Sequence, residues 1–185
     1  ETLLIKHDQL SDEKKHDYIE IAHRSSQHLR DLIAQLFELS KLEAGGISPN
    51  YEVFSLTELV YDVKQEYELQ AQTANISLNI QTPPENIMVT ADISLLQRVM
   101  HNLLDNALSH TPESGDILLR LEVAKGKVEI SVLDSGSGIS KNDLPFVFER
   151  YYQSSEQSEK CLKVGSGLGL SIVKKILHLH NTAVK

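Results

Sequence analysis

The chain has 185 residues, of which 41% are apolar, and this suits one domain with a hydrophobic core or one domain with an appendage. Its net charge of -8 argues against a nucleic-acid-binding surface, which needs clustered lysine and arginine. The single cysteine excludes an intrachain disulfide, and no apolar run reaches the roughly 18 residues that cross a bilayer, so we expect a soluble chain in a reducing compartment.

The first predicted element is a long amphipathic helix between residues 11 and 44. Ser11 suits its N-terminal cap, and Gly45 and Gly46 suit its end. At 1.5 Å per residue it would be roughly 50 Å long, too long to bury its apolar stripe on one small domain. The pattern therefore predicts a homodimer through a helical bundle, with an internal core helix as the alternative. The stripe consists of Ile19, Ala22, Ser26, Leu29, Ile33, Leu36 and Ser40.

A mixed pattern of helices and strands follows residues 45–50, where two glycines and a proline indicate a domain boundary. A helix is expected to begin at the capping box Ser55-Leu56-Thr57-Glu58. Alternating apolar residues predict several strands, the last two of which form a hairpin. This mixture indicates an α+β fold, a two-layer α/β sandwich with helices on one face of the sheet. The predicted strands cover residues 51–54, 76–80, 87–89, 117–123 and 128–132.

Asp92 is expected to cap a helix over about residues 93–109 that carries two asparagines. Asn102 and Asn106 fall one turn apart along the edge of its apolar stripe, whereas Asp105 points nearly opposite and is expected in solvent. An asparagine carbonyl is a hard oxygen ligand that suits Mg²⁺, which commonly takes one or two protein groups while nucleotide phosphates complete its shell. Asn106 is therefore the candidate metal ligand, and a merely exposed pair of asparagines is the alternative. The predicted stripe is Leu96, Val99, Leu103 and Ala107.

The last predicted strand leads into the segment Asp134-Ser135-Gly136-Ser137-Gly138-Ile139. Asp134 is in phase with the buried residues of the strand, and a carboxylate on the inner face is costly unless a donor meets it. A specific hydrogen-bond partner is therefore expected. Gly136 and Gly138 remove side chains where a flat ligand could lie against the backbone. The alternative is an ordinary strand that ends in an Asp-Ser-Gly turn.

A second glycine run, Gly165-Ser166-Gly167-Leu168-Gly169-Leu170, leads into an amphipathic helix over residues 171–177. Glycines at a helix start let backbone N–H groups approach phosphate, and the positive end of the helix favours that charge. The run fits neither the Walker pattern nor the dinucleotide fingerprint, which requires a strand before it. The polar residues 152–164 predict a mobile lid, with a surface loop of no function as the alternative.

Taken together, these segments resemble the sensor histidine kinases of bacterial two-component systems, whose catalytic domain has the Bergerat-type ATP fold shared with gyrase, the Hsp90 chaperone and MutL. The long helix resembles the second helix of that family's dimerisation and phosphotransfer hairpin. The resemblance implies dimerisation helices at 1–44, a linker at 45–50 and an ATP-binding domain at 51–185, truncated at its C-terminus. Four motifs carry it in order: an N box at 102–107, a G1 box at 134–139, an F box at 146–151 and a G2 box at 165–170.

The resemblance implies ATP and Mg²⁺ as cofactors and assigns roles to residues. Asp134 would accept from the adenine amine, and Asn106 would hold Mg²⁺ against the triphosphate with help from Asn102. Arg150 would offset phosphate charge, as would Lys160 or Lys163. Asn102 and Arg150 are thus the candidate catalytic residues for in-line phosphoryl transfer to a histidine nitrogen. The candidate nucleotide-binding residues are Asn102, Asn106, Asp134, Gly136, Gly138, Gly165, Gly167, Leu168, Gly169 and Leu170.

The expected function is that of a cytoplasmic catalytic fragment whose parent, anchored in a membrane or not, passes phosphate from a histidine to the receiver domain of a response regulator. The family's H box is absent, because His7-Asp8 resembles its start but lacks the downstream proline, so the phosphoacceptor is expected upstream. Ser109 and His110 stand where the family often has Lys and Tyr. The alternatives are a degenerate nucleotide-binding or dimerisation module and a gyrase- or MutL-like ATPase, which usually has Glu at the position of Asn102.

Overall fold

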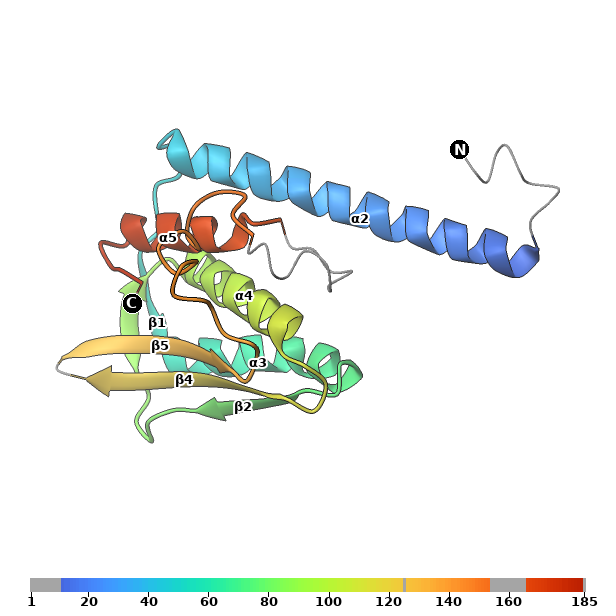
Figure 1. The fold of residues 1–185 in the computed structure, drawn as a ribbon. Helices are drawn as coiled ribbons and strands as arrows, with labels where there is room; N and C mark the ends of the chain where they lie inside the picture. Colours follow the sequence, from blue (N-terminus) through green and yellow to red (C-terminus); the bar gives the residue numbers. More distant parts are fainter. Residues whose placement is uncertain (1–10, 125, 154–165, 185) are drawn as a thin grey trace. The chain divides into compact units, whose positions relative to one another are not determined.

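The computed structural model describes residues 11–124, 126–153 and 166–184 of the chain. Its internal contacts divide the chain into two units, residues 1–40 and residues 41–185, and each is described by itself. Figure 1 shows the elements in chain order. Within the described ranges, no helix combines the length and the apolar character that a membrane span needs.

The first unit consists of most of helix α2 (Asp12–Glu43), which confirms the long helix expected from the sequence. The Ser11 hydroxyl accepts a hydrogen bond from the Lys14 amide at 3.4 Å, as a cap residue does. The helix ends before Gly45, whose φ of +67° is a conformation that glycine adopts without strain. The boundary between linker and catalytic domain at residues 45–50 stays a prediction.

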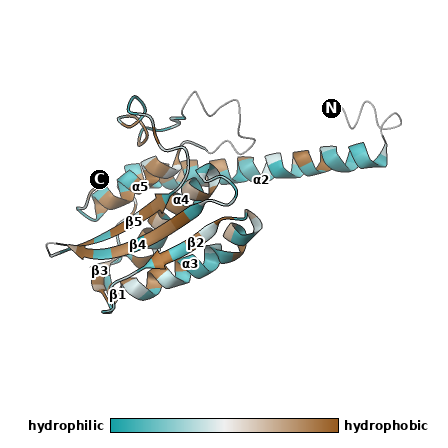
Figure 2. Cartoon of the chain, turned by 60° about the horizontal axis from the view of Figure 1, so that its bottom comes forward, coloured by the Kyte–Doolittle hydropathy of each residue, from teal (hydrophilic) through white to brown (hydrophobic). Residues whose placement is uncertain are grey.

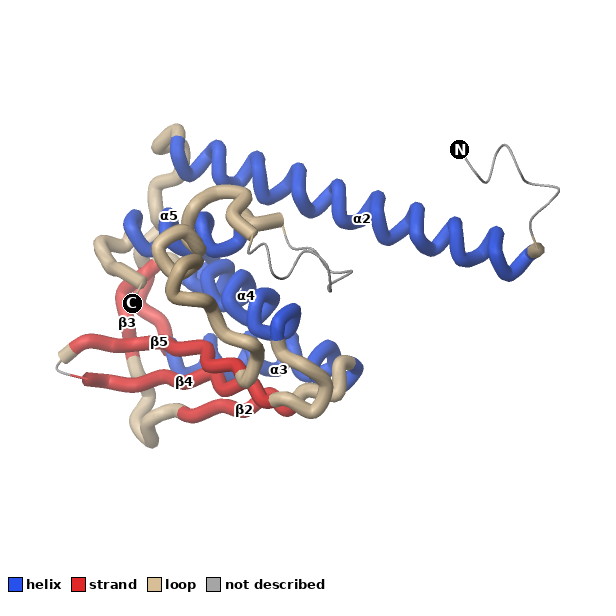
Figure 3. The backbone as a smooth tube through the Cα atoms, viewed as in Figure 1, coloured by secondary structure: helices blue, strands red, loops and turns tan. Residues whose placement is uncertain are grey.

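The described residues of the second unit form a three-stranded sheet and a two-stranded sheet. In the larger sheet the strand order is β2-β4-β5, with β2 parallel to β4 and β4 antiparallel to β5. The three strands run side by side in Figure 3. The hairpin of β4 and β5 pairs Ile117 with Asp134 and Val123 with Val128, as the alternation of apolar residues predicts. The strands are β1 (Glu52–Ser55), β2 (Ser77–Gln81), β3 (Met88–Ala91), β4 (Asp116–Ala124) and β5 (Lys127–Asp134).

Among the described residues of this unit, three helices accompany the sheets: α3 (Leu56–Thr73), α4 (Ile93–His110) and α5 (Gly169–Leu179). Helices α3 and α4 pack against the sheet, and α5 packs against α4, which confirms the α+β class with helices on one face. The apolar core lies between these layers, and Figure 2 shows the hydrophobic colouring along β4 and β5. Its fully buried side chains include Val60, Val63, Met100, Leu104, Ile117, Leu119 and Leu121.

Two caps predicted from the sequence are present. The Ser55 hydroxyl accepts from the Glu58 amide at 3.0 Å at the start of α3, and Asp92 Oδ1 accepts from the Leu95 amide at 3.0 Å at the start of α4. The predicted apolar stripe of α4 was wrong in part. Leu104 is fully buried whereas Leu103 is half-buried, because α4 is covered by α3 and α5 as well as by the sheet.

Candidate functional site

Helix α4 carries the two asparagines of the predicted site at the edge of the core, as expected. Asn102 is only 5% exposed, and its Nδ2 donates a hydrogen bond to the Arg98 carbonyl at 2.9 Å. Asn106 lies one turn further along the helix and is half-buried. Because Asn102 Nδ2 already donates this hydrogen bond, the Asn102 side-chain amide is held in one orientation.

The start of α5 lies against Asn102. A side-chain carbon placed on Gly169 would come within 3.1 Å of Asn102 Oδ1, so the glycine run and the asparagine helix meet here. Leu168, the residue before α5, gives the helix no side-chain cap, and its own amide donates to Ser166 Oγ at 3.0 Å. The first N–H groups of an uncapped helix are suited to bind an anion. Leu168 is buried and Leu170 is half-buried.

The far end of α5 is tied to the start of α4. The Asp92 amide donates to His180 Nε2 at 3.1 Å, and the His180 ring packs edge-on against Tyr51 at a centroid distance of 5.6 Å. The Tyr51 hydroxyl donates to the Leu179 carbonyl at 3.1 Å. These contacts hold the C-terminal end of α5 against the start of α4.

The Asp134 segment lies against the last turn of α4. A side-chain carbon on Gly136 would come within 2.5 Å of the His110 carbonyl oxygen, so glycine is required for this close approach. The Ser135 amide donates to the Asp116 carbonyl at 3.0 Å and keeps the segment on the sheet. Gly138, with φ of +71°, has open space around its Cα. The structure thus brings Asp134 and Gly136 to the same helix that carries Asn102 and Asn106.

The prediction that Asp134 faces the inner side of the sheet was wrong, because Asp134 is exposed. It stands at the end of β5, where burial does not alternate and the last two residues, Leu133 and Asp134, are both exposed. Asp134 Oδ1 accepts from the Gly136 amide at 2.9 Å, and the rest of the carboxylate is open to solvent, so no desolvation cost arises. The carboxylate is therefore accessible to a ligand.

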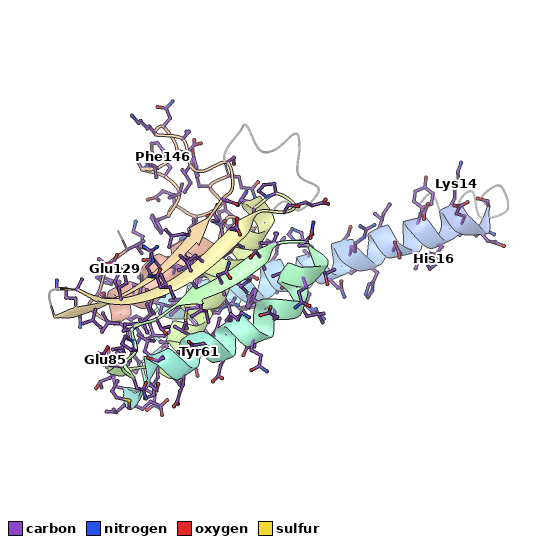
Figure 4. All side chains as sticks on the ribbon, turned by 90° about the horizontal axis from the view of Figure 1, so that it is seen from below. Lys14, His16, Tyr61, Glu85, Glu129 and Phe146 are labelled. Atoms are coloured by element: carbon purple, nitrogen blue, oxygen red, sulfur yellow. The ribbon has the colours of Figure 1, made fainter. Side chains whose placement is uncertain are left out.

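The F-box segment lies beside the second glycine run. The Tyr151 amide donates to the Gly167 carbonyl at 2.9 Å, and a side-chain carbon on Gly167 would come within 2.8 Å of the Tyr151 backbone. Phe146, which is labelled in Figure 4, belongs to the F-box segment. The Tyr152 hydroxyl donates a hydrogen bond to Asp143 Oδ1 at 2.5 Å and so links the residues on either side of the segment. Hydrogen bonding to Asp143 and burial raise the pKa of Tyr152, so this donor keeps its proton.

Arg150 pairs with the Glu43 carboxylate, and both side chains are partly exposed. An exposed ion pair of this kind is worth about 1 kcal/mol or less and can be exchanged for another anion. The role predicted for Arg150, to offset phosphate charge, stays a prediction. Gly165, Lys160, Lys163 and most of the predicted lid lie outside the described residues.

Sequence reasoning missed one polar contact beside the asparagines. The Tyr67 hydroxyl on α3 donates to Asp105 Oδ1 at 2.8 Å. Asp105 is exposed as predicted, but its carboxylate also accepts this hydrogen bond from Tyr67. The signal was available, because a tyrosine on the apolar side of a helix requires a partner for its hydroxyl.

Mg²⁺ prefers oxygen ligands. Among the described residues, no group of three or more His, Cys, Asp or Glu side chains could form a metal site. Mg²⁺ that binds with a nucleotide takes one or two protein groups, and phosphate and water oxygens complete its shell. The Asn106 carbonyl oxygen is a donor of that kind.

The chain is similar to known proteins over most of its length. A family model described as "Histidine kinase-, DNA gyrase B-, and HSP90-like ATPase" matches residues 91–185, about half of the chain. The chain is 35% identical over 164 residues to histidine protein kinase DivJ of Caulobacter vibrioides, a match that covers 89% of this chain and 27% of DivJ. It is 31% identical to the sensor-like histidine kinase SenX3 of Mycolicibacterium smegmatis, over 86% of this chain and 41% of that protein. The chain therefore spans less than half the length of these relatives.

Solved structures of similar fold are also histidine kinases. The catalytic domain of histidine kinase ThkA matches with a TM-score of 0.61 and 32% identity, over 70% of this chain and 80% of that one. ThkA in complex with the response regulator TrrA matches with a TM-score of 0.74 and 26% identity, over 94% of this chain and 47% of that one. The 94% of this chain that the ThkA–TrrA complex matches includes most of α2.

Proposed function

The chain belongs to the histidine kinase-, DNA gyrase B-, and HSP90-like ATPase family with the fold of a histidine kinase catalytic domain, and we propose that it binds Mg²⁺-ATP as the catalytic part of a protein-histidine kinase. One observation carries the proposal. Helix α4 meets the glycine start of α5 at Asn102 and the Asp134 segment at its last turn, so the separate motifs border one helix.

The proposed roles follow from these positions. The exposed Asp134 carboxylate accepts a hydrogen bond from the adenine amine, and Gly136 leaves the backbone bare beside it. Asn106 supplies one carbonyl oxygen to Mg²⁺, with Asn102 beside it. The uncapped N–H groups at Gly169 and Leu170 bind phosphate oxygens. Arg150 is released from Glu43 to neutralise phosphate charge.

The bound nucleotide supplies a γ-phosphoryl group for transfer to a nitrogen nucleophile. The residues of this chain contribute position and charge, which are the main sources of rate in phosphoryl transfer. Transfer is favoured over hydrolysis because Asn102 is a neutral amide whose NH₂ group is already bonded to Arg98, and an amide cannot remove a proton from water. A gyrase- or MutL-like ATPase is therefore not supported.

The partners of the parent protein belong to the same proposal. We place the phosphoacceptor histidine upstream of this chain, and we propose a response regulator receiver domain as the next acceptor. The support is the relative ThkA, whose solved structure is a complex with response regulator TrrA. We propose that both phosphoryl transfers, to the histidine and to the receiver domain, take place in the cytoplasm, where ATP is supplied.

The pocket is tested by measuring ATP affinity in excess Mg²⁺ for wild type, Asp134→Asn and Asn106→Ala. Loss of a charge-assisted hydrogen bond costs about 1.5 to 3 kcal/mol, so Asp134→Asn should weaken binding roughly 10- to 100-fold. Asn106→Ala should remove most of the gain in affinity that Mg²⁺ confers. Asp62→Asn and Asn79→Ala are matched controls at exposed positions outside the site and should bind as wild type does. Unchanged binding in both site variants would reject the pocket.

A further inference from the structure

We propose that Tyr67 is a positioning residue for the N-box asparagines, acting through Asp105 as part of a polar ladder between α3 and α4. The inference rests on the proposed function, because it assigns a further residue to the same nucleotide site. Tyr67 touches neither asparagine, and its effect passes through the rotation of α4 about its own axis.

The ladder consists of side-chain contacts at successive turns of α4. Gln97 Nε2 donates to Glu66 Oε1 at 3.0 Å, and His101 Nε2 donates to Glu66 Oε2 at 2.8 Å. The Tyr67 hydroxyl then donates to Asp105 Oδ1 at 2.8 Å and also lies 3.3 Å from the His101 carbonyl oxygen. Residues spaced by four on a helix lie on one face, so two adjacent residues of α3 bind one row of α4.

The next row of α4 is the N box. Asn102 follows His101 and Asn106 follows Asp105, so each asparagine lies about 100° around the helix from a ladder residue. Asn102 is in turn bonded to the Arg98 carbonyl and faces Gly169 of α5. The ladder and the nucleotide-binding face are therefore adjacent rows of one rigid helix, and a change in one row must move the other.

The geometry makes the asparagines sensitive to small rotations. A side-chain oxygen lies roughly 5 to 6 Å from the axis of a helix, so a rotation of about 10° moves it by roughly 1 Å. A misplacement of about 1 Å can cost on the order of 100-fold in the rate of an enzyme. Apolar packing between α3 and α4 has little directional preference, whereas a hydrogen bond fixes direction.

Tyr67 is the best-anchored member of the ladder. It is 8% exposed, and its ring packs on the His101 ring at a centroid distance of 5.5 Å, whereas the side chains of His101 and Glu66 are 26% and 47% exposed. Burial and the adjacent Asp105 carboxylate raise the pKa of Tyr67 above its ordinary value, so the hydroxyl stays protonated and remains a donor. The exposed His101–Glu66 contact is more weakly held.

The test compares Tyr67→Phe, which keeps the ring, with Tyr61→Phe on the same helix, where Tyr61 is 52% exposed and labelled in Figure 4. For each variant, ATP affinity is measured with Mg²⁺ and with EDTA, at a temperature well below its Tm. The ratio of the two constants cancels any change in the folded fraction, so a purely structural role would leave it unchanged. We expect Tyr67→Phe to lower this ratio about 3- to 10-fold and Tyr61→Phe to leave it at the wild-type value.

A second variant tests whether the effect of Tyr67 passes through Asp105. Asp105→Ala removes the acceptor from an exposed position and leaves the core ring of Tyr67 in place, so it carries the same test if Tyr67→Phe fails to fold. The double variant should lose no more than either single variant, because both remove one contact. A wild-type ratio in Tyr67→Phe and Asp105→Ala, or losses that add in the double variant, would overturn the inference alone. Failure of wild type to bind Mg²⁺-ATP would overturn the proposed function and this inference with it.

Discussion

At Gly136 the absence of a side chain lets the Asp134 segment lie against the last turn of α4. A β-carbon there would meet the His110 carbonyl oxygen at 2.5 Å and Asp134 Oδ1 at 2.7 Å. The first of these atoms belongs to a helix backbone and cannot rotate away. The residue therefore controls the distance between the adenine-binding carboxylate and the asparagine helix in the proposed site.

We expect Gly136→Ala to reduce the free energy of unfolding by about 1 to 3 kcal/mol, as overpacking does, and to weaken ATP binding. Gly46→Ala is the matched control, because the nearest atom to its added carbon is the Lys41 carbonyl oxygen at an ordinary 3.5 Å. Urea unfolding and ATP titration of both variants measure the effect. Equal unfolding free energies for the two variants would contradict the close approach.

Two aspartates show how far single-residue reasoning reaches. The position of Asp134 at the end of a strand was predicted correctly, its burial was predicted wrongly, and its contact with a ligand stays a prediction. Asp105 was correctly expected to be exposed, and its bond to Tyr67 was not foreseen. Both errors have one cause, since periodicity assigns each residue to one face of its own element and contains no information about where the neighbouring element ends.

At the scale of elements, the seam between α3 and α4 makes stability depend on alkaline pH. The pKa of Tyr67 is raised in the folded state by burial and by Asp105, whereas a tyrosine in the unfolded chain has a pKa of about 10. The folded state thus holds this proton more tightly than the unfolded state does. The contribution is fully present below about pH 10 and is lost as the pH rises above that value toward the folded-state pKa.

We therefore expect the free energy of unfolding of wild type to fall between about pH 10 and 11, and the fall to be shallower in Tyr67→Phe. Urea unfolding at several values between about pH 8 and 11 measures it. Tyr61→Phe keeps Tyr67 and should follow the wild-type curve. Parallel curves for wild type and Tyr67→Phe would show that Tyr67 ionises as freely in the folded chain as in the unfolded one.

At the scale of the whole molecule, helix α2 presents apolar side chains that the single chain leaves exposed. Leu29, Ile33 and Leu36 are 58%, 47% and 48% exposed, and they belong to the stripe of alternating three- and four-residue spacing. Such a stripe is typical of a helix that packs on another helix. The homodimer through α2 stays a prediction, and this exposure supports it.

We expect Ile33→Glu to shift the protein toward monomer, because the stripe would then bury an unpaired charge. Gln27→Glu adds the same charge to the same helix outside the stripe and should leave the dimer intact. Sedimentation equilibrium of both variants and wild type gives the association constants. A monomeric wild type, or equal dissociation in the two variants, would exclude α2 as the dimer contact.

The helices, the strands and their caps could be predicted because they depend on residues close together in the chain. Ser11, Ser55 and Asp92 each cap the helix expected of them, since a cap bonds to an amide three residues later. The four motifs, and with them the family, could be recognised for a similar reason: each is a short run of particular residues. The approach of Gly169 to Asn102, and the identity of Asp105 as the hydrogen-bond partner of Tyr67, could not be foreseen. Both contacts arise from packing between elements that are far apart in sequence. This packing also sets the rotation of α4 about its own axis.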